Sequence, residues 1–302
     1  MNTSFVRSFK AARRVSTPLI AVQTPDQAMT IETLNNALTN GSVPPILQWD
    51  CVRGIQWVNQ PGLAVCWTVI GQKMTAPVPT TQDELNRFRV ELGRATINIV
   101  NTLEAAQKLP ESAVLICMNM QMAWDKAPVI QAAWNLRDQF KQDQRVLVML
   151  TDMGAVIPLG LRDALPLVEE LPTLEELAAI VDEQAEAAGI TITPEVRTAA
   201  VNAVCGLPAF SAEQSIALSF MRNDAGEIYL NTEAAWDRKS ALVSQTHGLS
   251  VWRGRDSFDT LGGLHTIKSF MLDVLRGQDP PRAIVFIDEI EKAFAGASGG
   301  DG

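Results

Sequence analysis

Cysteine, histidine and tyrosine are scarce in this sequence of 302 residues, which has four, two and one of them. The cysteines stand far apart without a Cys-x-x-Cys pair, at Cys51, Cys66, Cys117 and Cys205, so a zinc site is not expected. Apolar neighbours of Cys66 and Cys117 predict reduced, buried thiols and a cytoplasmic protein. No apolar run approaches the roughly 18 residues needed to span a bilayer, so no membrane partner is expected.

Positive charge is also in short supply, with a net charge of −9, so overall charge predicts no general affinity for nucleic acid backbone. The exception is the N-terminus, where no acid precedes Asp26 and four basic residues share a helical surface: Arg7, Lys10, Arg13 and Arg14. Such a segment can be a transit peptide. We favour an amphipathic helix of the first domain, because a predicted strand follows at once.

The sequence lacks a phosphate-binding loop of the form Gly-x-x-x-x-Gly-Lys-[Ser/Thr]. Its first half nevertheless alternates between the patterns of strands and helices. Strands are predicted at 17–24, 45–57 (with a turn), 62–69, 114–120 and 145–152. Helices are predicted at 26–38, with Asp26 as the N-cap, and at 82–108 and 127–140. This alternation favours a parallel sheet covered by helices on both faces.

The strand expected at 114–120 ends near Asn119, and a neutral amide is a poor anchor for a metal. We therefore interpret residues 1–160 as a degenerate sheet domain that does not hydrolyse nucleotide. An unrelated α/β binding domain is the alternative that the sequence leaves open.

The most informative stretch runs from Ala283 to Ala295 and reads Ala-Ile-Val-Phe-Ile-Asp-Glu-Ile-Glu-Lys-Ala-Phe-Ala. Its apolar residues 284–287 suit a strand buried on both faces of a parallel sheet. Asp288 and Glu289 would then lie at the carboxyl edge, where open α/β sheets bind ligands. A core strand followed by a helix that Asp288 caps is the alternative interpretation.

The string Phe-Ile-Asp-Glu-Ile-Glu-Lys-Ala-Phe within this stretch resembles the Walker B region of AAA+ ATPases. The resemblance implies that Asp288 binds Mg²⁺ and that Glu289 is the catalytic residue that polarises the attacking water. Residues 256–264, Asp-Ser-Phe-Asp-Thr-Leu-Gly-Gly-Leu, resemble the segment that opens an AAA+ module. By that resemblance the residues that contact adenine are Leu261, Gly262 and Gly263.

Helices are also predicted at 171–181, 194–204 and 211–221, with Thr173 and Ser211 as N-caps, and residues 239–251 are predicted to be a connector. Residues 206–214 resemble the helical lid of AAA+ modules. From Asp163 to Glu195 there are nine acids and no Lys or Arg. We interpret them as a solvated helix face, and a docking surface for a basic partner is the alternative.

Only twenty residues separate Gly263 from Ile284, enough for a helix at 265–276 and a turn, but too few for the usual strand, phosphate loop and helix. The loop is therefore lost, supplied by another subunit, or located after the Walker B segment, and the glycine-rich end at Gly302 favours the last. The layout is similar to that of phage-type AAA proteins with a rearranged ATPase module, and implies a C-terminally truncated chain.

The predicted fold class is thus α/β: a parallel-sheet, P-loop-NTPase-like (AAA+) domain without a P-loop, a helical lid, and an incomplete second AAA+ module. The expected boundaries are 1–160, 161–253 and 254–302.

The resemblance implies that the complete protein is an ATPase that uses ATP and Mg²⁺ to remodel a protein or nucleoprotein partner, and that it forms a homo-oligomeric ring. The 302-residue chain, without a Walker A motif, is expected to be inactive. A non-catalytic scaffold or adaptor with a vestigial nucleotide site is the alternative.

Overall fold

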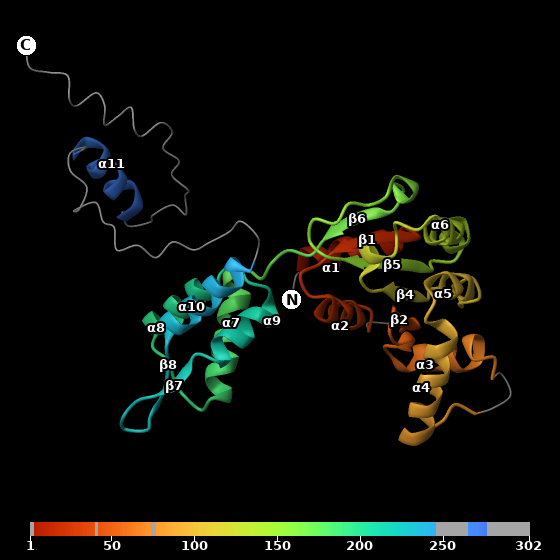
Figure 1. Ribbon diagram of the computed structural model, residues 1–302, viewed down its shortest axis with the longest axis horizontal. Coiled ribbons are helices and arrows are strands. Elements are labelled where there is room, and N and C mark those ends of the chain that lie inside the picture. The colour runs from red at the N-terminus through yellow and green to blue at the C-terminus, as the bar shows by residue number, and fades with distance from the viewer. Residues whose placement is uncertain (1–2, 40–41, 74–76, 246–264, 277–302) are drawn as a thin grey trace, which may run out of the picture. The chain divides into compact units, whose positions relative to one another are not determined.

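The computed structural model of the protein describes residues 3–39, 42–73, 77–245 and 265–276, which fall in two compact units, 1–249 and 250–302 (Figure 1). In the second unit the described residues form helix α11 (His265–Arg276), as predicted. All other elements below belong to the first unit. No described helix is both long and apolar enough to cross a bilayer.

Six strands of the first unit form one sheet in the order β3-β2-β4-β5-β1-β6. Neighbours run parallel, except that β2 and β3 form an antiparallel pair at one edge. The strands are β1 (Leu19–Gln23), β2 (Ile46–Asp50), β3 (Gly54–Trp57), β4 (Val114–Cys117), β5 (Val146–Thr151) and β6 (Leu165–Val168). The predicted α/β class with a mainly parallel sheet is confirmed.

Helices cover both faces of this sheet, because alternate residues of each buried strand are apolar on both sides. Leu147 and Met149 of β5 face one core, while Val148 and Leu150 face the other. The first core packs against α3 (Gln60–Val65), α4 (Gln82–Thr96), α5 (Ile99–Ala106) and α6 (Ala127–Gln142), and the second against α1 (Thr3–Arg14) and α2 (Gln27–Ala37).

The basic N-terminal segment forms the predicted helix, α1, and buries Phe5 and Phe9 in the second core. Cys66 and Cys117 are buried as predicted, and burial raises the pKa of both thiols.

A helical bundle with its own core follows the sheet (Figure 1). It comprises α7 (Leu174–Ala187), α8 (Pro194–Val204), α9 (Ala209–Ala217), the hairpin of β7 (Phe220–Arg222) and β8 (Ile228–Leu230), and α10 (Thr232–Ser244). Thr173 and Glu176 form a capping box at the start of α7. Arg197 of α8 donates two hydrogen bonds to Asp182 of α7, at 2.7 and 2.6 Å, and lowers the pKa of that carboxyl.

The strand predicted at 62–69 is wrong, because this segment forms α3 and a π-helical turn, Cys66–Ile70. Its residues favour a strand, but Asn59 caps a helix by accepting a hydrogen bond from the backbone N–H of Gly62 (2.9 Å), and Pro61 suits the first helical turn. Gly62 also lies so close to β2 that a Cβ there would be 2.3 Å from the carbonyl oxygen of Ile46.

Two helix predictions have wrong boundaries. The helix predicted at 82–108 is broken into α4 and α5, because Asn98 caps a new helix by accepting from the N–H of Val100 (2.9 Å). The helix predicted to begin at Ser211 begins at Ala209 after Pro208, and it ends at Ala217, where β7 follows. Part of the expected connector is helical, since α10 extends to Ser244.

Two short 3-10 turns, Met120–Met122 and Leu159–Leu161, connect elements of the sheet. The edge strand β6 was not predicted. Its residues alternate between half-buried Leu165 and Leu167 and exposed Pro166 and Val168. It is a strand only because β1 offers a parallel partner from Ile20 to Gln23.

The close approach of α4 to the β2–β3 turn makes a testable prediction about stability. A Cβ on Gly93 would lie 2.4 Å from the carbonyl oxygen of Arg53. Gly93→Ala should therefore lower the free energy of unfolding by about 1 kcal/mol, because overpacking of about 1–3 kcal/mol exceeds a helix-propensity gain of up to about 1 kcal/mol. Urea denaturation measures this change. The neighbouring exposed Arg94→Ala is the control, and an unchanged Gly93→Ala variant would contradict the packing.

Candidate functional site

The residues that the AAA+ resemblance implies for catalysis lie outside the described part of the chain, so their roles stay predictions. They are Asp288, Glu289, Leu261, Gly262 and Gly263. The described candidate site is the carboxyl edge of the sheet in residues 3–245. In open parallel sheets this is the edge at which ligands bind.

Asp26 caps α2 shortly after β1, an interior strand that lies next to the edge strand β6. Its Oδ1 accepts hydrogen bonds from the backbone N–H groups of Ala28 (3.1 Å) and Met29 (3.0 Å), so the predicted cap is confirmed. Those N–H groups form the positive end of the helix, which in a strand–P-loop–helix unit holds phosphate. The loop contains neither glycine nor lysine, and the anion at this helix terminus is the protein's own carboxylate.

A reciprocal pair of hydrogen bonds connects this loop to the end of β4. The side-chain amide of Gln27 donates to Oδ1 of Asn119 (2.9 Å), and the backbone N–H of Asn119 donates to Oε1 of Gln27 (2.9 Å). Asn119 has a φ of +53°, a left-handed conformation that asparagine tolerates. The amide that the sequence marked as a poor metal anchor therefore serves as a partner for the β1–α2 loop.

Buried hydroxyls connect the same loop to the end of β6. The Thr30 hydroxyl of α2 donates to the carboxylate of Glu169, and its oxygen lies 2.7 Å from that of Thr24. The Thr24 oxygen also accepts from the N–H of Asp26 (3.0 Å). Glu169 is only 9% exposed, and the sequence offered no signal for its role, because the strand that positions it was not predicted.

A cavity of about 340 Å³, which we name the sheet-edge cavity, lies where β1, β4 and β5 end. Its polar walls come from Asp26, Gln27, Asn119 and Asp152, and the Asp152 carboxylate accepts a hydrogen bond from Gln121 (2.8 Å). Pro208, Phe210 and Ser211 at the start of α9 complete it. No Lys or Arg is found among its described lining residues, so a polyphosphate would meet carboxylates without a compensating cation.

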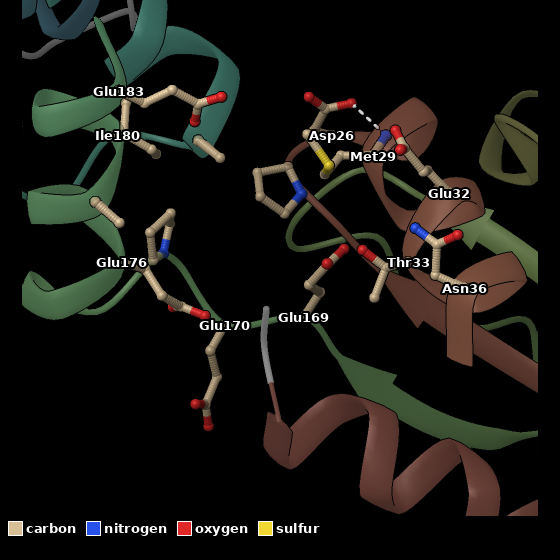
Figure 2. A pocket seen from close by; sticks show the side chains of 14 residues that line it. Asp26, Met29, Glu32, Thr33, Asn36, Glu169, Glu170, Glu176, Ile180 and Glu183 are labelled. Atoms are coloured by element: carbon tan, nitrogen blue, oxygen red, sulfur yellow. Dashed lines mark hydrogen bonds between the residues drawn. The ribbon is translucent and has the colours of Figure 1, made fainter. Parts of the chain in front are cut away.

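A second cavity, the acidic pocket, has a volume of about 360 Å³ and is lined by α2, the segment after β6, and α7 (Figure 2). Its carboxylates belong to Asp26, Glu32, Glu169, Glu170, Glu176 and Glu183. Apolar parts come from Met29, Ile180 and Ala209, and again no described lining residue is basic. Such a pocket favours cationic and apolar groups and disfavours anions.

Despite these acids, the described residues contain no group of three or more His, Cys, Asp or Glu side chains arranged to hold a metal ion. The β1–α2 loop does not fit MgATP, because its anion position is taken and it has no lysine for the phosphates. We therefore assign no chemistry on a bound triphosphate to the sheet domain, residues 1–160.

Comparison with known proteins identifies the family to which this sheet belongs. The sequence profile of the SpoVK-like AAA ATPase N-terminal domain matches residues 5–170. The chain belongs to this AAA ATPase family. The match spans the six-stranded sheet and ends just after β6, so it is separate from the residues 256–295 on which the AAA+ resemblance rested.

No curated protein matches the chain in sequence. Among solved structures, PCH-2 of C. elegans is 11% identical, covers 79% of this chain and 68% of its own, and gives a TM-score of 0.47. Domain III of the replication initiation protein DnaA from Thermotoga maritima is 12% identical, covers 79% and 92%, and gives a TM-score of 0.44. A structure of the E. coli MS115-1 HORMA:CdnC:Trip13 complex is 14% identical, covers 78% and 82%, and gives 0.43.

The AAA+ assignment made from the sequence is thus confirmed at the level of the family. The phage-type origin, the rearranged order of Walker motifs and the truncation stay predictions.

The capping role of Asp26 predicts a specific loss of stability in this AAA ATPase domain. Asp26→Ala should lower the free energy of unfolding by about 1 kcal/mol, because two N–H groups of α2 lose their acceptor. Asp26→Asn is the matched control and should lie within a few tenths of a kcal/mol of the wild type, since asparagine caps equally well. Urea denaturation of the three proteins decides, and equal losses in both variants would show that the charge, not the cap, matters.

Proposed function

We propose that residues 1–160 are the non-hydrolysing N-terminal module of an AAA+ ATPase whose catalytic chemistry belongs to a second module beginning at about residue 254. The observation that carries this proposal is the Asp26 carboxylate bound to the N-terminus of α2, where a nucleotide phosphate would otherwise bind. Residues 161–253 would serve as a helical lid and connector between the two modules.

In the second module, Asp288 would hold Mg²⁺ and Glu289 would orient the attacking water, while Leu261, Gly262 and Gly263 would contact adenine. These roles are supported by the AAA+ resemblance of residues 256–264 and 283–295. Because the 302 residues contain no Gly-x-x-x-x-Gly-Lys-[Ser/Thr], the phosphate loop would come from a segment after the Walker B residues or from another subunit.

The complete protein would then use ATP to remodel a protein or nucleoprotein partner as a homo-oligomeric ring. A cytoplasmic location is supported by the buried, unpaired thiols of Cys66 and Cys117.

A non-catalytic scaffold or adaptor is the second candidate. It is favoured by the same edge of the sheet, where the side chains of Asp26, Gln27 and Asn119 are all used in internal hydrogen bonds. In that case Asp288 and Glu289 would be vestigial.

The 302-residue chain should show no Mg²⁺-dependent ATP turnover above background in a phosphate-release assay, because the charge neutralisation that phosphoryl transfer requires is incomplete. Robust turnover that is lost in Glu289→Gln but kept in the control Glu291→Gln would contradict the prediction that the chain is inactive because it has no phosphate loop. The coding sequence after Gly302 separates the two functions: a loop ending in Gly-Lys-Ser or Gly-Lys-Thr supports the ATPase, and an immediate stop codon supports the scaffold.

A further inference from the structure

A loop on the first-core face of the sheet exposes large apolar side chains. We name residues 153–162, between β5 and β6, the apolar loop. Val156 is 83% exposed and Leu159 is 87% exposed, the latter being the highest value among the exposed large hydrophobic residues described. Both side chains belong to one short loop, and exposed apolar residues that are grouped mark contact sites more often than those scattered singly.

The apolar loop is held in one conformation by its neighbours. The side chain of Gln23 donates to the carbonyl of Ala155 (2.9 Å) and accepts from the N–H of Gly154 (3.2 Å). Ile157 packs against the first core and Leu161 is fully buried in it. Val156 and Leu159 are therefore presented outward by a supported segment, which reduces the conformational entropy that binding would cost.

A cation stands beside these apolar residues. Arg162 is exposed, and among the residues that the structure describes no acid forms an ion pair with it. The adjacent Asp163 pairs instead with Arg137 (2.7 Å). The loop thus offers two aliphatic groups and one available guanidinium.

The acidic pocket has the opposite and complementary character. Figure 2 shows Met29 and Ile180 facing the space between α2 and α7, with Glu32 and Glu183 at its sides. Met29 is 39% exposed, so the pocket offers apolar surface beneath carboxylates. At about 360 Å³ it falls in the size range of sites that enclose small groups, and can take aliphatic side chains with a cation at the rim.

These two surfaces lie on opposite faces of the sheet. The apolar loop packs on the core that α3 to α6 cover, whereas the pocket is built on α2, which covers the other core. One copy of the chain therefore cannot fill its own pocket with its own loop. A contact between them is heterologous and, repeated from copy to copy, generates a ring or a filament.

We propose that the apolar loop of one copy docks into the acidic pocket of a second copy, with Val156 and Leu159 on its apolar surface and Arg162 at its carboxylate rim. Local complementarity is needed for such an assembly, because the chain's net charge of −9 opposes self-association. The inference rests on the proposed function, because it specifies a contact between subunits of the proposed ring. The contact needs no nucleotide, since Arg162 pairs with carboxylates of the pocket and not with phosphates.

Sedimentation velocity of the 302-residue chain without nucleotide tests this contact. At concentrations up to about 100 μM, which reveal association of micromolar strength, the wild type should increase in mass with concentration. Leu159→Asp should weaken association at least about tenfold, as expected for a central apolar contact. Val52→Asp is the matched control: Val52 is 77% exposed in the β2–β3 turn, away from both surfaces, and its replacement should leave association unchanged.

A charge exchange tests the pairing of the two surfaces. Arg162→Glu and Glu183→Arg should each weaken association, and the double variant should recover part of the loss, which additive effects of unrelated sites cannot produce. Arg94→Glu, an exposed charge reversal on α4, should have no comparable effect.

A wild-type chain that stays monomeric, a Leu159→Asp variant that associates like the wild type, or a double variant without recovery would each overturn the docking proposal. None of these results bears on ATP turnover, so the proposed ATPase function would stand or fall separately by the phosphate-release assay.

Discussion

The hydrogen bonds from the first turn of α2 to the Asp26 carboxylate are the interaction around which the sheet edge is arranged. A helix that begins directly after an interior parallel strand presents unpaired N–H groups and partial positive charge at the edge where such sheets bind ligands. A hydrogen-bond acceptor must satisfy them, and here the loop itself supplies one in the Asp26 carboxylate. A phosphate could bind only by displacing a carboxylate that is covalently present at high effective concentration.

The neighbouring polar contacts make this arrangement independent of any ligand. Gln27 and Asn119 connect the loop to β4, and the hydroxyl of Thr30 connects α2 to Glu169 after β6. Leaving a buried polar group without its partner costs about 1–3 kcal/mol, so opening this edge to admit a nucleotide would be opposed at several points at once. A domain with this edge is suited to a structural role that does not depend on a bound nucleotide.

Charge is distributed unevenly over the domain. Basic residues of α1 lie beside the second core, while acids collect around α2 and along α7. The acidic stretch that the sequence suggested as a solvated face or as a docking surface thus lines a pocket in part, through Glu169, Glu176 and Glu183. Acids that surround an apolar surface favour cationic groups at that surface and disfavour anions. Acids on a fully solvated helix have no adjoining apolar surface on which to act in this way.

Much of the fold was determined by the sequence alone. The apolar runs within 114–120 and 145–152 predicted buried parallel strands, which the structure shows at Val114–Cys117 and Val146–Thr151. The acid or hydroxyl before a helical pattern predicted the caps of α2 and α7 at Asp26 and Thr173. The missing glycines and lysine predicted a sheet without phosphate chemistry, and the profile of residues 5–170 places that sheet in an AAA ATPase family. These features depend on neighbours within a few residues along the chain, so they can be read locally.

Tertiary structure decided the rest. Residues 62–69 have strand-forming side chains but fold as a helix, because Asn59 caps them and Gly62 packs against β2. The edge strand β6 exists only through its pairing with β1, and it alone brings Glu169 to Thr30. Nor could the sequence tell that Leu161 is buried while Leu159 is exposed, since both are leucines two positions apart. In each case the outcome depends on a partner distant in sequence, and burial or pairing with that partner outweighs the local preference of the residues.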